Sequence, residues 1–389
     1  MTLKTRLTVL LISTPVLAFV IVGGLMGNAS ARTSEDTFQH LAVFQDVVRL
    51  VMGSYVEEVK IDRVMEGAMR GLADSLDPDS AYLTPKQVRD VEAGATPPEG
   101  DVGVELTRSY YLRVIASRDG SPAAKAGLAT GDVVRAIDGK STREMSVYEG
   151  TRLLRGQPGS KVVVTIIRSN AADPHEVTLV REKPAGTLVN SRMLANSDTG
   201  YIRIASFRGN VVADVKKHAA ELTSSGAKSL ILDVRRTADG SIENGVEAAR
   251  LFVKSGTLTQ RGSEQRGTTE KIDARPGDGA IDLPAVLLVS AGTTGAAEVF
   301  AAALDGNNRA DLVGEHTLGR AGVQKLVKLP ENRGLWLTYA RYTTPAGEAI
   351  HGKGLRPDQA VDDPDVEFGA TATSDPILDA AVARLKKKE

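Results

Sequence analysis

Cysteine is absent from this 389-residue sequence, and its absence excludes disulfides and thiolate metal sites. An excess of positive charge is also lacking, because 48 lysines and arginines stand against 49 aspartates and glutamates, so the chain has no basic footprint for nucleic acid. Histidine is scarce, and no pair among His40, His175, His218 and His351 has the spacing of metal ligands. We therefore predict no metal, no other cofactor and no nucleic-acid partner.

Hydrophobic residues make up 42% of the chain, which is enough for two or three domains with real cores. An uncharged stretch from Leu7 to Met26 follows Lys4 and Arg6 and ends just before the small-residue site Ala29-Ser30-Ala31. This pattern predicts a signal peptide over residues 1–31. A stretch of about twenty apolar residues is also just long enough to span a bilayer, so an uncleaved membrane anchor is the alternative. Either way we expect the bulk of the protein in the periplasm, free or anchored to the inner membrane.

Residues 32–96 have the pattern of a helical segment. Apolar residues recur at spacings of three and four up to Gly53, and further short helices are predicted from Asp62 to Leu72 and from Pro85 to Ala93. Thr84 and Gln87 have the spacing of a capping box. Helices this short need a partner surface, either the rest of the chain or a second copy, so homo-oligomerisation is possible. The stretch Gly94 to Gly100, GATPPEG, reads as a linker.

Residues 97–184 alternate short strands with two short helices. Strands are predicted at Tyr110 to Ala116, Val133 to Ile137, Lys161 to Arg168 and Glu176 to Arg181, and helices after Ser121 and over Met145 to Leu154. The run SPAAKAGLATGDVVRAIDG resembles the signature of bacterial PDZ domains, and LLRGQPGSKVVVTIIR resembles its continuation.

The PDZ resemblance implies a groove for peptides. Such domains add an extended chain end as an extra strand and hold its carboxylate on backbone amides of a glycine-containing loop. That loop would be Val102-Gly103-Val104, leading into a strand through Leu106, with the flanking apolar residues lining a side-chain pocket. The alternative is that Gly103 only makes a turn.

Residues 185–361 alternate strand and helix, which predicts a mixed sheet covered by helices. Arg261 to Gly279 is polar and without period, so we interpret it as an exposed excursion. Residues 362–389 read as a polar lead-in to a helix from Pro376 to Leu385. Trp336 and Tyr339 lie on an alternating strand, where we expect them to pack.

The stretch from Pro284 to Gln324 has the order of a catalytic turn. An apolar strand, Val286 to Val289, breaks into a small-residue turn, Ala291 to Gly295, and continues as a helix from Glu298. Strand, tight turn and helix present a nucleophile in other serine hydrolases. No serine or cysteine stands where that nucleophile would sit.

The order of helical segment, PDZ signature and α/β part resembles the carboxy-terminal processing peptidases, also called tail-specific proteases. The segments SLDPDSAYL, GYIRIASF, LVGEHTLGRAGVQ and LTYARYTTPAGEAIHGKGLRPDQAV are similar to family motifs, and the likeness covers nearly all of the chain after the leader. The resemblance implies a mixed α/β multidomain fold: a helical N-terminal segment, a PDZ domain and an α/β core whose mixed sheet is of the tail-specific protease (ClpP/crotonase-like) type.

The resemblance also implies a serine nucleophile and a lysine general base. Anchored on Glu298, the nucleophile position of the family falls on Gly295, and the lysine position falls on Arg320. Glycine has no side chain that could attack, and arginine stays protonated because its pKa lies above about 12. Gln324, a supporting polar residue in the family, is retained.

A third departure concerns the oxyanion turn, which here reads DVRRTADG. The close-approach glycine of the family falls on Asp239 or Gly240, and an aspartate there would repel a developing oxyanion. Replacement chemistry would have to come from neighbours. Ser290, Thr293 and Thr294 carry hydroxyls near the turn and His316 lies in the segment of the base, but a shift of one or two residues on a sharp turn aims a hydroxyl elsewhere.

Three hypotheses follow. The first is an exported pseudopeptidase that binds protein C-terminal tails through its PDZ groove or regulates an active relative. The second is an active serine-type endopeptidase that cleaves near protein C-termini with unorthodox residues. The third is a structural assembly protein that associates through its helical N-terminus.

Overall fold

The computed structural model describes residues 38–93, 98–168, 173–184, 187–263, 267–364, 368 and 373–387. The predicted leader lies outside these residues, as do parts of the linkers predicted before residue 101 and before residue 376. The chain divides into two compact units, one ending at Gly71 and one beginning at Leu72. The other domain boundaries stay predictions.

The first unit contains a helix over residues 38–54 and most of α2, Ile61–Asp74. The helix ends one residue beyond the predicted stop at Gly53. Its large apolar side chains are exposed; they include Phe38, Leu41, Phe44, Val47 and Leu50. Among the described residues, no helix combines the length and the hydrophobicity that crossing a membrane requires.

The larger unit begins with a short strand and a capped helix, β1 (Ala81–Leu83) and α3 (Pro85–Glu92). The predicted capping box is confirmed, because the Thr84 hydroxyl accepts from the Gln87 amide and the Gln87 side chain accepts from the Thr84 amide at 2.8 Å. In the preceding loop the Asp77 carboxylate accepts from the amides of Asp79 (2.9 Å) and Ser80 (2.8 Å). These bonds fix the backbone that carries the Asp79 side chain.

The PDZ-like part is an antiparallel sheet with the strand order β2-β3-β4-β6-β7, and β5 pairs with β4. Its strands are β2 (Val104–Arg108), β3 (Leu112–Ser117), β4 (Val133–Ile137), β5 (Lys140–Ser141), β6 (Lys161–Ile167) and β7 (His175–Val180). Its helices are α4 (Pro122–Lys125) and α5 (Val147–Leu154), and the predicted cap Ser121 accepts from the Ala124 amide. Among the described strands β2 pairs with β3 alone, so it is an edge strand of this sheet.

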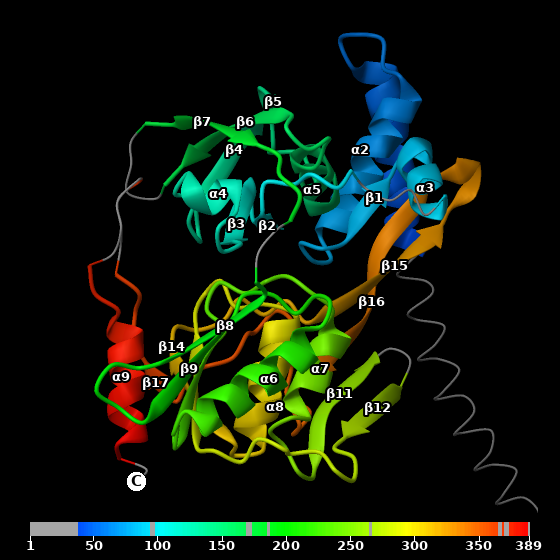
Figure 1. Ribbon diagram of the computed structural model, residues 1–389. Helices are drawn as coiled ribbons and strands as arrows, with labels where there is room; N and C mark the ends of the chain where they lie inside the picture. Colours follow the sequence, from blue (N-terminus) through cyan, green and yellow to red (C-terminus); the bar gives the residue numbers. More distant parts are fainter. Residues whose placement is uncertain are drawn as a thin grey trace, which may run out of the picture. The chain divides into compact units, whose positions relative to one another are not determined.

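The central sheet has the strand order β17-β14-β13-β10-β9-β8 (Figure 1). β8 (Val189–Met193) runs antiparallel to β9 (Thr199–Ile204), whereas β10 (Ser229–Asp233), β13 (Ala285–Val289), β14 (Ala310–Gly314) and β17 (Gln359–Ala360) add in parallel. The sheet is therefore mixed, as predicted.

Helices cover both faces of this sheet, which explains why its strands are continuous apolar runs. Leu230, Leu232 and Leu287 pack on the face covered by α6 (Val211–Ser224), α7 (Ile242–Ala249) and α8 (Ala296–Gly306). The alternate residues Ile231 and Val286 pack against α9 (Pro376–Leu385).

A third sheet qualifies one prediction. The described residues of the segment 261–279 are mostly exposed, as predicted, but part of the segment is regular, because β11 (Thr257–Ser263) and β12 (Thr268–Asp273) form an antiparallel hairpin. β11 also pairs with β16 (Gly334–Thr343), which pairs in turn with β15 (Gly322–Lys328) and β1. The sequence of the hairpin has no hydrophobic period because most of β12 is exposed. Pairing of β11 with the distant strand β16 stabilises the hairpin, and no local sequence pattern encodes that pairing.

Candidate functional site

The turn between β13 and α8 holds Gly295 in a backbone conformation that favours glycine. This residue precedes α8 with φ of +62° and ψ of −118°, a conformation that residues with a side chain rarely adopt. A sharp strained turn between strand and helix is the arrangement that exposes a nucleophile in hydrolases. There is room for a side chain, since a Cβ built on Gly295 would meet only the Arg320 carbonyl oxygen, at 3.7 Å.

The buried side chain of Glu298 joins this turn to the segment around residue 320. Its carboxylate accepts hydrogen bonds from the amides of Gly295 (3.1 Å), Gly319 (2.6 Å) and Arg320 (2.7 Å) and from the Thr317 hydroxyl. Burial raises the pKa of Glu298 above its ordinary value, and these four donors oppose the rise. The structure thus brings together positions 295 and 320, which the family resemblance had paired.

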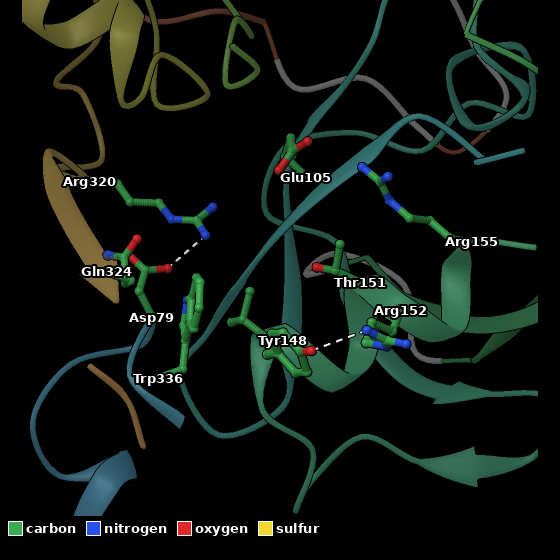
Figure 2. Close-up of a pocket in the computed structure, with 10 residues that line it drawn as sticks. Asp79, Glu105, Tyr148, Thr151, Arg152, Arg155, Arg320, Gln324 and Trp336 are labelled. Carbon is green, nitrogen blue, oxygen red and sulfur yellow. Dashed lines mark hydrogen bonds and ion pairs between the residues drawn. The ribbon is translucent and has the colours of Figure 1, made fainter. Parts of the chain in front are cut away.

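The Arg320 side chain bridges two other parts of the larger unit. One guanidinium nitrogen, Nη2, lies 2.7 Å from the buried carboxylate of Asp79, and the other, Nη1, donates to the carbonyl of Leu106 at 3.1 Å. Figure 2 shows the guanidinium directed toward Asp79. The side chain at the position of the base is therefore engaged with an acid and with β2.

The hydroxyls around the turn are mostly bound to backbone. The Thr293 hydroxyl donates to the Val234 carbonyl at 2.9 Å, and the Ser290 hydroxyl accepts from the Arg236 and Gly292 amides. The Thr294 hydroxyl differs, since it is buried without a hydrogen-bond partner within the described part of the chain. The His316 ring approaches the neighbouring Thr317 carbonyl at 2.9 Å. No histidine hydrogen-bonds to any of these hydroxyls within the described part of the chain, so no base is positioned for them there.

The turn at Asp239 and Gly240, which the family resemblance assigns to the oxyanion hole, is held by backbone proximity and by charge. Gly240 has φ of +117°, and a Cβ there would lie 2.3 to 2.5 Å from the Phe207 backbone, so only glycine fits. The Asp239 carboxylate pairs with Arg208 at 2.6 Å and accepts from the Ser206 hydroxyl at 3.2 Å. A negative side chain therefore stands in this turn, partly neutralised by Arg208 and, at 4.0 Å, by Arg118.

The predicted carboxylate-binding loop contains a glycine that the packing requires. Gly103 has φ of +76°, and a Cβ there would lie 2.2 Å from the Ser121 Cβ. Val104 is partly exposed, but Val102 and Leu106 are buried in the core of the PDZ-like part. The side chains of Val102 and Leu106 therefore cannot line a ligand pocket, and only their backbone groups could contact a ligand.

A cavity of about 330 Å³ lies between β2, α5 and the strands β15 and β16 (Figure 2). Its lining includes the following side chains: Asp79, Glu105, Tyr148, Arg155, Arg320, Gln324 and Trp336. Gln324 donates to the Thr338 hydroxyl at 3.1 Å. Trp336 packs near Tyr148, with ring centroids 6.1 Å apart, as expected for a packing residue, yet it also lines this cavity.

The sequence analysis did not predict three of the residues that line this cavity: Asp79, Glu105 and Trp336. Asp79 lies in the SLDPDSAYL motif, which was the available signal for it. Glu105 stands between two residues of the predicted groove but carries no motif of its own. No group of three or more histidine, aspartate or glutamate side chains among the described residues could hold a metal ion.

Two family models match the chain. The model of peptidase family S41 matches residues 198–361, and that of the PDZ domain matches residues 113–168. A carboxyl-terminal-processing protease of Synechocystis sp. is 34% identical over 320 residues, which are 80% of this chain and 74% of that protein. A carboxy-terminal-processing protease of Bartonella bacilliformis is 29% identical over 342 residues, or 87% and 78% of the two chains. A solved structure of a photosystem II D1 C-terminal processing protease superposes with a TM-score of 0.68 at 29% identity, covering 82% of this chain and 92% of that one.

Proposed function

The chain belongs to the carboxy-terminal processing proteases of peptidase family S41, and from this membership we propose that it is an exported member that binds protein C-terminal tails without cleaving them. The family, the PDZ domain and the mixed α/β fold predicted from the sequence are confirmed. The loss of proteolysis, the export to the periplasm or inner membrane, and the nature of the bound peptide are parts of the proposal.

One observation carries the proposal of inactivity. Gly295 occupies the turn that suits a nucleophile but offers no atom for attack. Arg320, beside it in the fold, keeps its charge at any physiological pH, and its guanidinium is engaged by Asp79 and Leu106. A general base must lie within hydrogen-bond reach of the proton that it removes. Neither the attacking group nor its base is therefore in place.

Peptide binding rests on the PDZ domain and on β2. Domains of this kind bind an extended chain end along an edge strand, and β2 is such an edge among the described strands. The positive φ of Gly103 keeps the loop before β2 close to Ser121, and we expect backbone amides of this loop to hold a ligand carboxylate. We expect protein C-terminal tails as ligands, and an active relative of the same family as a further partner.

The test uses casein as an unstructured substrate. The purified protein is expected to leave casein intact. Cleavage that appears only in the double variant Gly295→Ser with Arg320→Lys would show that the fold is intact and lacks its reactive groups, although Asp239 in the predicted oxyanion turn works against such a gain. Gly295→Ser alone and Gly295→Ala with Arg320→Lys serve as matched controls, because the first lacks a base and the second lacks a hydroxyl. Wild-type cleavage that copurifies with the protein and persists after Thr293 and Thr294 are replaced by alanine would contradict the proposal.

The alternative of an active endopeptidase has one observation in its favour. The Thr294 hydroxyl is buried beside Gly295 without a hydrogen-bond partner in the described structure. If Thr294 were the nucleophile, Thr294→Val would abolish any wild-type cleavage of casein and Thr293→Val would not. We expect neither variant to differ from a wild type that does not cleave.

A further inference from the structure

The free edge of β2 exposes specific backbone groups, and the register of the sheet identifies them. Leu106 lies opposite Val114 of β3, directly after a register shift between Glu105 and Leu106. The Val114 amide and carbonyl both bond to the loop before β4, through the Asp132 carbonyl (2.9 Å) and the Gly131 amide (2.8 Å). In antiparallel pairs, opposite residues either exchange both hydrogen bonds or direct both sets of groups away from each other. The backbone groups of Leu106 therefore face away from β3, toward the edge where a peptide strand would add.

Arg320 occupies that edge. Its Nη1 donates to the Leu106 carbonyl at 3.1 Å, while its Nη2 is held by Asp79, whose side chain is only 5% exposed. Arg320 also lines the cavity that β2 and α5 border, next to the sheet edge to which a peptide strand would add. The carbonyl that an added strand would use is thus already bonded to a permanently charged donor.

We propose that Arg320 closes the peptide groove between β2 and α5, so that a C-terminal peptide pairs with β2 only after Arg320 leaves the Leu106 carbonyl. This inference rests on the proposed peptide-binding function and adds its regulation. The residue at the position of the catalytic base has become a competitor of the ligand. Asp79 is the second partner that keeps Arg320 in place.

The charges around the groove fit this role. Arg320 and Asp79 neutralise each other, so closing the groove buries no unpaired charge in that contact. Arg152, also in the cavity lining, pairs with Asp90 at 3.0 Å and with the Tyr148 hydroxyl at 3.1 Å, which holds α5. A peptide that enters the groove therefore meets α5, which is fixed to α3, and the Leu106 carbonyl, which is already bonded to Arg320.

The protein contains its own reporter for the test, because Trp336 is the sole tryptophan of the sequence and lines the cavity. The full chain is incubated with a pool of octapeptides whose last four residues are randomised and whose carboxylate is free, and the amidated pool is the ligand control. Binding is measured by captured peptide mass and by Trp336 emission. The accessibility of Trp336 without peptide is measured by acrylamide quenching.

The main variant is Arg320→Met, which keeps an apolar stem and loses every donor. Because Arg320→Met leaves the buried Asp79 carboxylate without its arginine partner, we add the double variant Asp79→Asn with Arg320→Met, which removes that charge as well. Arg192→Ala is the matched control, because it removes an arginine that lies over the Tyr201 ring, outside the cavity lining. We expect both Arg320 variants to bind the free-carboxylate pool about tenfold more tightly than the wild type, which corresponds to about 1.4 kcal/mol. We also expect acrylamide to quench Trp336 emission more strongly in these variants than in the wild type. Arg192→Ala should match the wild type.

The outcomes separate the two proposals. Equal binding by the wild type and both Arg320 variants, or weaker binding by the variants, overturns the closing role and leaves peptide binding standing. Faster quenching in the Arg320 variants without any peptide capture overturns the proposed function but supports the closed groove. Unchanged quenching in both Arg320 variants contradicts the closing role whatever the peptide result.

Discussion

Replacing Glu105 by glutamine should change how the stability of this protein depends on pH. Glu105 lies on β2 in the cavity lining, and no hydrogen bond or ion pair joins its carboxylate to another described residue. Burial raises the pKa of Glu105 from 4.5 to about 7. Among its charged neighbours the Asp239 carboxylate adds to the rise, and the three arginines Arg320, Arg208 and Arg155 oppose it.

The sign follows from comparing the folded and the unfolded chain. Below pH 4.5 Glu105 is protonated in both states and costs nothing. As the pH rises toward 7, the unfolded chain releases this proton first, so the free energy of unfolding falls. Above pH 7 the loss is complete. A difference of 2.5 units corresponds to about 3 kcal/mol at 1.36 kcal/mol per unit. Glu105→Gln cannot ionise and should escape this loss.

The measurement is urea unfolding followed through Trp336 emission at several pH values between 5 and 8. We expect the stability of Glu105→Gln relative to the wild type to increase by about 2 to 3 kcal/mol across this range. Glu176→Gln, the same exchange at an exposed position of β7, is the control and should run parallel to the wild type. Parallel curves for Glu105→Gln and the wild type would refute the argument that the folded chain holds this proton.

Two further predictions concern stability. Asp375→Asn removes the charge that pairs with Arg235 at 2.7 and 2.9 Å, and it should lower the free energy of unfolding by about 1 to 2 kcal/mol. Asp379→Asn, at an exposed position of the same helix, should lower it less. Equal losses for the two variants in urea titrations would contradict this prediction. Gly240→Ala would place a Cβ 2.3 Å from the Phe207 backbone and should lower the free energy of unfolding by more than about 3 kcal/mol. Gly139→Ala, at a residue with positive φ but open space around it, should lower it by about 1 kcal/mol. Similar melting temperatures for the two variants would show that the clash at residue 240 is relieved.

Local patterns predicted many of the elements because the signal for them lies within a few residues. The capping box at Thr84, the strand at Val133 to Ile137 and the helix at Pro376 to Leu385 all formed where predicted. The exposed hairpin of β11 and β12 was missed, since its stability comes from pairing with β16, some 80 residues along the chain. A strand held by a distant partner needs no hydrophobic period of its own.

The candidate site shows the same division. Sequence and family resemblance together singled out Gly295 and Arg320, and glycine at one and a permanent cation at the other already exclude the usual serine and lysine chemistry. Neither pattern nor spacing predicted where the Arg320 side chain would go. Its partners, Asp79 and the Leu106 carbonyl, lie more than 200 residues away along the chain.

What the sequence by itself determined is therefore the family, the order of the parts, and the presence of glycine and arginine at positions 295 and 320, because these depend on residue identity. Only the tertiary structure decided that the buried Glu298 draws the Gly295 turn and the Arg320 segment together, and that Arg320 then reaches β2. The physical reason is that hydrogen bonds and burial depend on the approach of distant segments, which the folded chain alone defines.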